Sequence, residues 1–141
     1  MLKLLVPTDG SDNALRAVRH VVALAERGVK AEVVLLNVQP PVMSGEVGQV
    51  APIEIAEDKR AMAAGTAVAK ARAALDAGGV PVTVHEAIGN AAKEIAAGAE
   101  RYQCDGIVMG RRGLGTLASL LMGSVSEQVL RLARVPVTLV K

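Results

Sequence analysis

The residues best suited to chemistry lie in one glycine-rich stretch, from Gly110 to Ser126, which reads GRRGLGTLASLLMGSVS. Gly110 and Gly113 frame a turn in which the missing Cβ would let the backbone approach a ligand closely. The residues from Gly123 onward open an amphipathic run, so their N–H groups would lie at a helix N-terminus, where the helix dipole favours an anion. The stretch therefore predicts a phosphate-binding loop between a strand and a helix.

Three other interpretations of these glycines and serines compete with this one. A Walker P-loop needs Lys and Ser or Thr directly after its second glycine, and the sequence contains no Gly-Lys pair. Residues 113–118 fit a relaxed dinucleotide-binding pattern, but residues 133–141 lack the carboxylate that would hold a ribose. Ser124 and Glu127 could also form a capping box that merely closes a helix end, which would leave Gly110 and Gly113 unexplained.

The spacing Gly-x2-Gly-x9-Gly-Ser, with Met109 before it and Val125-Ser126 at its end, resembles the nucleotide-binding signature of the universal stress protein family, in its ATP-binding branch. The resemblance continues in residues 7–11 (PTDGS), 37–38 (NV) and 135–137 (VPV), so it covers nearly the whole chain. It implies a module that binds ATP or another adenine nucleotide in the stress response. A Mg or Mn ion could accompany the phosphates.

By this resemblance, Asp9 and Val38 line the adenosine side, and the glycines and serines cradle ribose and phosphates. Arg112 could neutralise phosphate charge, although an arginine in an exposed loop is commonly just solvated. Asp9 could instead cap the following helix. The expected nucleotide-binding residues are Pro7, Asp9, Val38, Met109, Gly110, Arg112, Gly113, Gly123, Ser124, Val125 and Ser126.

Apolar runs alternate with helical periodicity along the chain. They predict one α/β domain over residues 1–141, a doubly wound sheet of five parallel strands with helices on both faces. The expected strands are residues 2–6, 32–38, 80–87, 105–110 and 136–141. In the order 3-2-1-4-5, which universal stress proteins share, strands one and four end at Asp9 and Gly110 beside one crevice.

Several local features are expected as well. Ser11, Asp12 or Asn13 can cap the first helix, and Asn90 the third. Pro81 places the third strand near a sheet edge. The apolar set of the last helix is expected to be Val125, Val129, Leu130 and Leu132. Residues 39–52 would form either a lid or an ordinary loop.

Composition excludes several classes of function. The 141 residues include 16 basic and 14 acidic side chains, a net charge of +2, and Tyr102 is the only aromatic residue. This balance argues against nucleic-acid binding, and a bound base would meet aliphatic walls. Cys104 is the only cysteine, and no apolar run approaches the roughly 18 residues of a membrane span, so we expect a cytoplasmic protein.

No strong catalytic set accompanies the loop, since Asp9 is the one acidic helper and no histidine or P-loop lysine lies near it. The sequence thus favours a regulatory module with slow or no ATP hydrolysis. A nucleotide-free assembly protein of the same fold and a small phosphate-handling hydrolase are the alternatives. A homodimer is expected through the strand from Pro136 to Lys141, an apolar edge that related proteins typically use.

Overall fold

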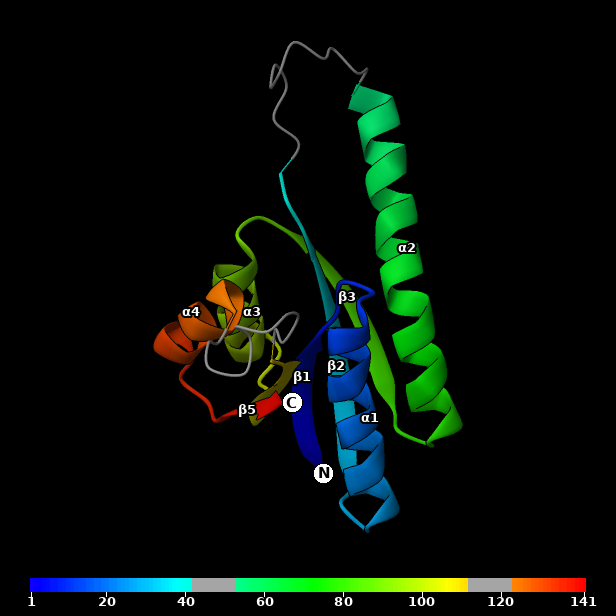
Figure 1. Ribbon diagram of the computed structural model, residues 1–141, viewed down its shortest axis with the longest axis vertical. Helices are drawn as coiled ribbons and strands as arrows, with labels where there is room; N and C mark the ends of the chain where they lie inside the picture. The colour runs from blue at the N-terminus through cyan, green and yellow to red at the C-terminus, as the bar shows by residue number, and fades with distance from the viewer. Residues whose placement is uncertain (42–52, 112–122) are drawn as a thin grey trace.

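The computed structural model describes residues 1–41, 53–111 and 123–141. Strands and helices alternate along the chain (Figure 1). Their bounds are β1 Leu2–Pro7, α1 Asp12–Glu26, β2 Ala31–Gln39, α2 Ile53–Ala77, β3 Val82–Ile88, α3 Ala91–Arg101, β4 Gly106–Gly110, α4 Ser124–Leu132 and β5 Val137–Val140.

The five strands form one parallel sheet in the order β3-β2-β1-β4-β5, which confirms the predicted fold class and strand order. β1 is the central strand. It pairs with β2 from Leu2↔Ala31 to Pro7↔Leu36, and with β4 at Leu4↔Gly106 and Leu5↔Ile107. The winding direction therefore reverses between β1 and β4, where a ligand crevice is expected outside the carboxyl ends of the strands.

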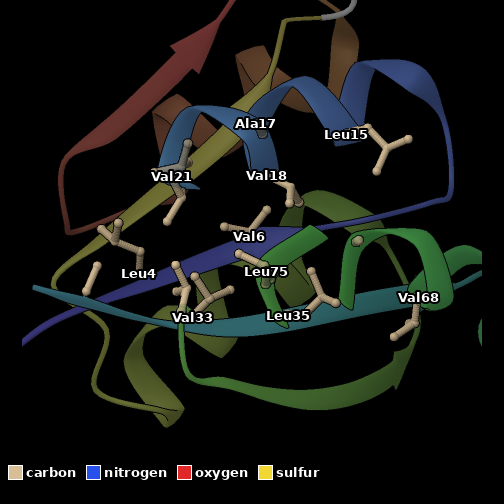
Figure 2. Close-up of a cluster of buried hydrophobic side chains, with 14 residues drawn as sticks. Leu4, Val6, Leu15, Ala17, Val18, Val21, Val33, Leu35, Val68 and Leu75 are labelled. Carbon is tan, nitrogen blue, oxygen red and sulfur yellow. The ribbon is translucent and has the colours of Figure 1, made fainter. Parts of the chain in front are cut away.

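Helices cover both faces of the sheet, with α1 and α2 on one side and α3 and α4 on the other (Figure 1). Successive strand residues point to opposite faces, so Val33 and Leu35 join the cluster under α1 and α2, while Val34 and Leu36 join the other. Figure 2 shows the first cluster, in which Val6 and Val18 lie between the strands and α1. Aliphatic side chains thus fill both layers.

Two helix N-termini have the predicted caps. The Ser11 hydroxyl accepts a hydrogen bond from the Ala14 N–H at 3.2 Å, and Asn90 Oδ1 accepts one from the Lys93 N–H at 3.0 Å. α4 begins differently, because its N-cap is Gly123, in an extended conformation with no side-chain hydrogen bond. Ser124 is already helical, so the capping-box interpretation is wrong.

The predicted apolar set of α4 is partly wrong. Val129 is fully buried and Val125 half-buried, but Leu130 is 41% and Leu132 46% exposed. Ser126, three residues before Val129 on the same face of the helix, is buried in place of an apolar residue. Leu130 lies only about 40° around the helix from Ser126, so the neighbouring elements and not the helical period decide which side chains are buried. Leu130 and Leu132 are thus each exposed, on different sides of α4.

The edges of the sheet are β3 and β5, and the edge position predicted for β3 is confirmed. β2 runs one residue further than expected, to Gln39. Residues 42–52, which hold most of the expected lid or loop, lie outside the described residues. No described helix is both long enough and apolar enough to cross a membrane.

Candidate functional site

A cavity of about 390 Å³ lies where β1 and β4 end, at the reversal of the winding. The strand ends and the starts of α1, α3 and α4 surround it. Its lining residues are Pro7, Thr8, Asp9, Ser11, Asn13, Ala14, Leu36, Val38, Ala91, Ile95, Met109, Gly110, Gly123, Val125 and Ser126. Two segments more than 100 positions apart in the chain therefore meet at one cavity, as the strand order requires.

Most of the predicted site residues lie together at this cavity. Those that line it are Pro7, Asp9, Val38, Met109, Gly110, Gly123, Val125 and Ser126. Ser124 does not line the cavity, and its side chain is exposed on the first turn of α4. Arg112 and Gly113 lie outside the described residues.

Asp9 enters the cavity from the loop between β1 and α1. Its Oδ1 accepts a hydrogen bond from the Ser11 N–H at 2.9 Å, which closes a tight turn, and Ser11 rather than Asp9 caps α1. One carboxylate oxygen thus stabilises the loop and the other is left for a ligand. Asp9 is the only residue with a carboxylate in the described part of the lining.

The start of α4 supplies the opposite polarity. The first hydrogen bond within the helix runs from the Glu127 N–H to the Gly123 carbonyl, at 3.0 Å. The N–H groups that precede Glu127 in the helix receive no side-chain cap, because Gly123 has no side chain that could accept from them. A helix N-terminus carries a partial positive charge, which favours an anion. Ser126, a residue that is 2% exposed, adds a hydroxyl-bearing side chain to the residues that line the cavity. This wall suits a phosphate group.

The remaining wall is aliphatic, as a chain without phenylalanine or tryptophan requires. Leu36, Val38 and Ile95 belong to it. Sequence reasoning missed the contribution of α1 and α3, namely Asn13, Ala14, Ala91 and Ile95. The available signal was the four-residue spacing of Ala91 and Ile95 directly after the Asn90 cap, which places both on one face at the helix start.

The described residues contain no group of three His, Cys, Asp or Glu side chains placed to hold a metal ion. A magnesium ion often needs only one or two protein carboxylates when nucleotide phosphates supply other ligands. A metal that arrives with a nucleotide would thus need few protein ligands, whereas a resident metal has no cluster to hold it in the described part of the chain.

Comparison with known proteins shows which sequences resemble this chain. A sequence model of the Universal stress protein family matches residues 1–141. The universal stress protein MJ0531 of Methanocaldococcus jannaschii is 34% identical to the chain over 142 residues, which cover 99% of this chain and 81% of that protein. The sequence similarity thus runs through the strands, helices and cavity alike.

Solved structures show the same architecture. The structure of the hypothetical protein MJ0577 is 30% identical, has a TM-score of 0.76 and covers 99% of this chain and 95% of its own. A universal stress protein solved in complex with cAMP is 26% identical, has a TM-score of 0.69 and covers 99% of this chain and 96% of its own. The second of these binds an adenine nucleotide.

Proposed function

Because this chain belongs to the universal stress protein family, we propose that it binds an adenine nucleotide, ATP first, in the cavity between the ends of β1 and β4. The observation that carries the proposal is that one cavity is lined both by a carboxylate and by a helix N-terminus with its partial positive charge. Asp9 enters from one side, and the start of α4, which has no side-chain cap, lies on another. A nucleotide has a matching neutral, hydrogen-bonding end and an anionic end.

In the proposed orientation, the adenosine lies against Val38 and Ile95, and the phosphates lie at Gly123 and Ser126. Aliphatic walls exclude water from the base without the help of aromatic stacking. Gly113 and Arg112 complete the phosphate side in this proposal, by close backbone approach and by charge. The complex of a related protein with cAMP supports the class of ligand.

The module regulates by occupancy rather than by rapid chemistry. Hydrolysis of ATP needs an oriented water and groups that stabilise the charge developing on the transferred phosphoryl. Among the lining residues that the structure describes, Asp9 is the only acid and there is no lysine, arginine or histidine. We therefore assign the chain a regulatory role in the stress response, with slow hydrolysis at most.

Titration calorimetry with ATP, AMP and cAMP tests this proposal, with Val38→Trp as the blocking variant. Val38 is half-buried at the cavity wall, so an indole there fills the space meant for adenosine. Ile88→Trp is the matched control, since Ile88 is 52% exposed and does not line the cavity. The parent and the control should bind and Val38→Trp should not. Equal binding by all three would place the ligand elsewhere.

Gly123→Val tests the phosphate side in the same assay. A valine side chain at the N-cap of α4 would occupy the space next to the first N–H groups of the helix, so it should abolish ATP binding. Its extended backbone, with φ −62° and ψ 154°, accepts valine without strain. Undiminished ATP binding by a folded Gly123→Val protein would show that the start of α4 does not bind the phosphates.

The proposed assembly is a homodimer through β5. β5 is an edge strand, and Leu130 and Leu132 expose apolar surface on α4, the helix that leads into it. An apolar edge with unpaired backbone groups is a template for a second chain, and twofold symmetry closes such a pair.

A further inference from the structure

Three buried polar side chains are found among the described residues, those of Thr8, Asn37 and Ser126, and Asn37 is the most buried at 0% exposed. Thr8 and Ser126 line the cavity, while Asn37 lies between the lining residues Leu36 and Val38. A buried amide lowers stability unless its hydrogen bonds are made, so its partners indicate what it does.

Asn37 connects the ends of β1 and β2. The pairing of the two strands stops at Pro7↔Leu36, although β2 continues beside β3 as far as Gln39. Just beyond this last pair, Asn37 Nδ2 donates a hydrogen bond to the carbonyl oxygen of Thr8 at 2.8 Å. Gln39 Nε2 donates to Asn37 Oδ1 at 2.7 Å and so orients the amide. A side chain thus continues the connection where the backbone ladder ends.

Thr8 carries the network into the loop that holds Asp9. The Thr8 hydroxyl donates to the Ala67 carbonyl in α2 at 3.3 Å and accepts from the Gly10 N–H at 3.4 Å. Gly10 has φ +84°, and a Cβ there would lie 3.0 Å from Ala67 Cα, so its backbone is packed tightly on α2. Asp9 is therefore fixed by residues on both sides.

We propose that Asn37 is a positioning residue for Asp9. By holding the Thr8 carbonyl, it sets the direction in which the backbone leaves β1 and from which the Asp9 carboxylate enters the cavity. Asn37 alternates with Val38, so its side chain lies on the α2 face of the sheet, behind the cavity, and acts without touching the ligand. The binding part of this inference rests on the proposed function, whereas the structural part concerns the ligand-free protein.

Amide hydrogen exchange of the ligand-free protein tests the structural part. Asn37→Leu keeps the side-chain volume and removes the hydrogen bonds, so exchange at Gly10 and Ser11 should rise about tenfold. Val21→Ala is the control, because Val21 is a fully buried residue of α1 that does not line the cavity. Unchanged exchange at Gly10 and Ser11 relative to Val21→Ala would overturn the proposal.

A second variant keeps the test decisive if Asn37→Leu does not fold. Gln39→Leu removes the donor that orients the Asn37 amide, at a half-buried position that tolerates an apolar side chain. It should raise exchange at Gly10 and Ser11 in the same direction and by less. Exchange at these two amides equal to the parent's would count against the proposal.

ATP calorimetry in a double-mutant cycle tests the link to Asp9. Asn37→Leu should weaken ATP binding about tenfold in the parent, and about twofold or less when Asp9→Asn has already removed the carboxylate charge. Equal losses in both backgrounds would show that Asn37 acts independently of Asp9 and overturn the proposal. Failure of the parent to bind ATP would instead overturn the proposed function, and hydrogen exchange would then decide the role of Asn37.

Discussion

Gly110, the last residue of β4, packs against Asn13 in the first turn of α1 so closely that a Cβ on Gly110 would lie 2.7 Å from the Asn13 carbonyl carbon. This contact brings the start of α1 to the cavity. The sequence predicts that Gly110 leaves room for a ligand. In the structure, its missing Cβ leaves room for α1.

Gly110→Ala should therefore lower the free energy of unfolding by about 1–3 kcal/mol, the usual cost of overpacking. Gly65→Ala is the matched control, since Gly65 lies in α2 and a Cβ added there would have nothing within 4 Å. At that position the same added methyl group should raise stability by about 0.5–1 kcal/mol through helix propensity. Urea unfolding measures both, and equal effects would contradict the packing argument.

Asp9→Ala should weaken ATP binding about tenfold, the scale of a lost hydrogen bond to a charged group, and change stability less. We expect the loss in Mg²⁺ and in EDTA alike, because Asp9 is proposed to lie on the adenosine side. Asp12→Ala removes a neighbouring exposed carboxylate that does not line the cavity and should bind ATP like the parent. A loss of ATP affinity that is seen only with Mg²⁺ would show that Asp9 acts on the metal and not on the adenosine.

Bound ATP should be recovered intact after hours with the purified protein, because Asp9, the only acid among the described lining residues, is proposed to lie on the adenosine side, where it does not orient a water for attack on the phosphates. Chromatography of the released nucleotide measures this directly. Many turnovers per minute in a preparation free of contaminating ATPase would favour the hydrolase over the regulatory module.

Leu139→Pro should convert the proposed dimer to a monomer. The carbonyls of Pro136 and Val140 accept hydrogen bonds from the N–H groups of Ile107 in β4 and of Arg111 directly after it. Because the backbone groups of successive strand residues point to opposite sides, the Thr138 N–H also faces β4 and the Leu139 N–H faces outward. Proline at 139 removes the outward donor. Light scattering should report a dimer for the parent, and a monomeric parent at millimolar concentration would refute the assembly.

Thr138→Pro is the companion of that variant. It removes a donor that faces β4, so it should weaken the β4–β5 ladder and lower stability instead of acting on the interface alone. The melting temperatures of the two variants separate these effects. A Thr138→Pro protein as stable as its parent would contradict the orientation of β5.

Burial raises the pKa of the Cys104 thiol above its ordinary value of 9.0, while the nearby Lys3 ammonium lowers it in part. The folded protein therefore keeps the proton after the unfolded chain has released it, so stability should fall as the pH rises above about 9. At pH 8, a thiol reagent should modify Cys104 at least about tenfold more slowly in the folded protein than in denaturant. Equal rates would contradict the burial.

The strands and the caps at Ser11 and Asn90 were predictable because each rests on local chemistry, whereas the strand order was predicted from the resemblance to the universal stress protein family. A continuous apolar run becomes a buried parallel strand, and a short polar side chain before an apolar period becomes a cap. Most of the expected cavity residues also lie together, since parallel strands end at one edge. Their role in binding stays a prediction.

What could not be predicted depends on contacts between distant elements. The face that α4 buries is set by its neighbours, and they select Ser126 and Val129 over Leu130. The close packing of Gly110 against Asn13 depends on the path of α1. Asn13 and Ile95 line the cavity because α1 and α3 approach the sheet at this point. The bond from Asn37 to Thr8 needs the register of β1 and β2, which no spacing in the sequence reveals.

Tyr102 stacks on His85 with ring centroids 4.0 Å apart and planes 12° from parallel, and the chain has no tryptophan or phenylalanine. Its phenol is therefore the source of near-ultraviolet fluorescence from this protein. Tyr102 and His85 lie with Lys3 around a hollow near the start of β1, and the Tyr102 carbonyl accepts from the Lys3 ammonium at 3.2 Å, while the cavity is at the other end of that strand. The fluorescence of Tyr102, the C-cap of α3, should therefore change when α3 unfolds and should not change when a ligand binds in the cavity.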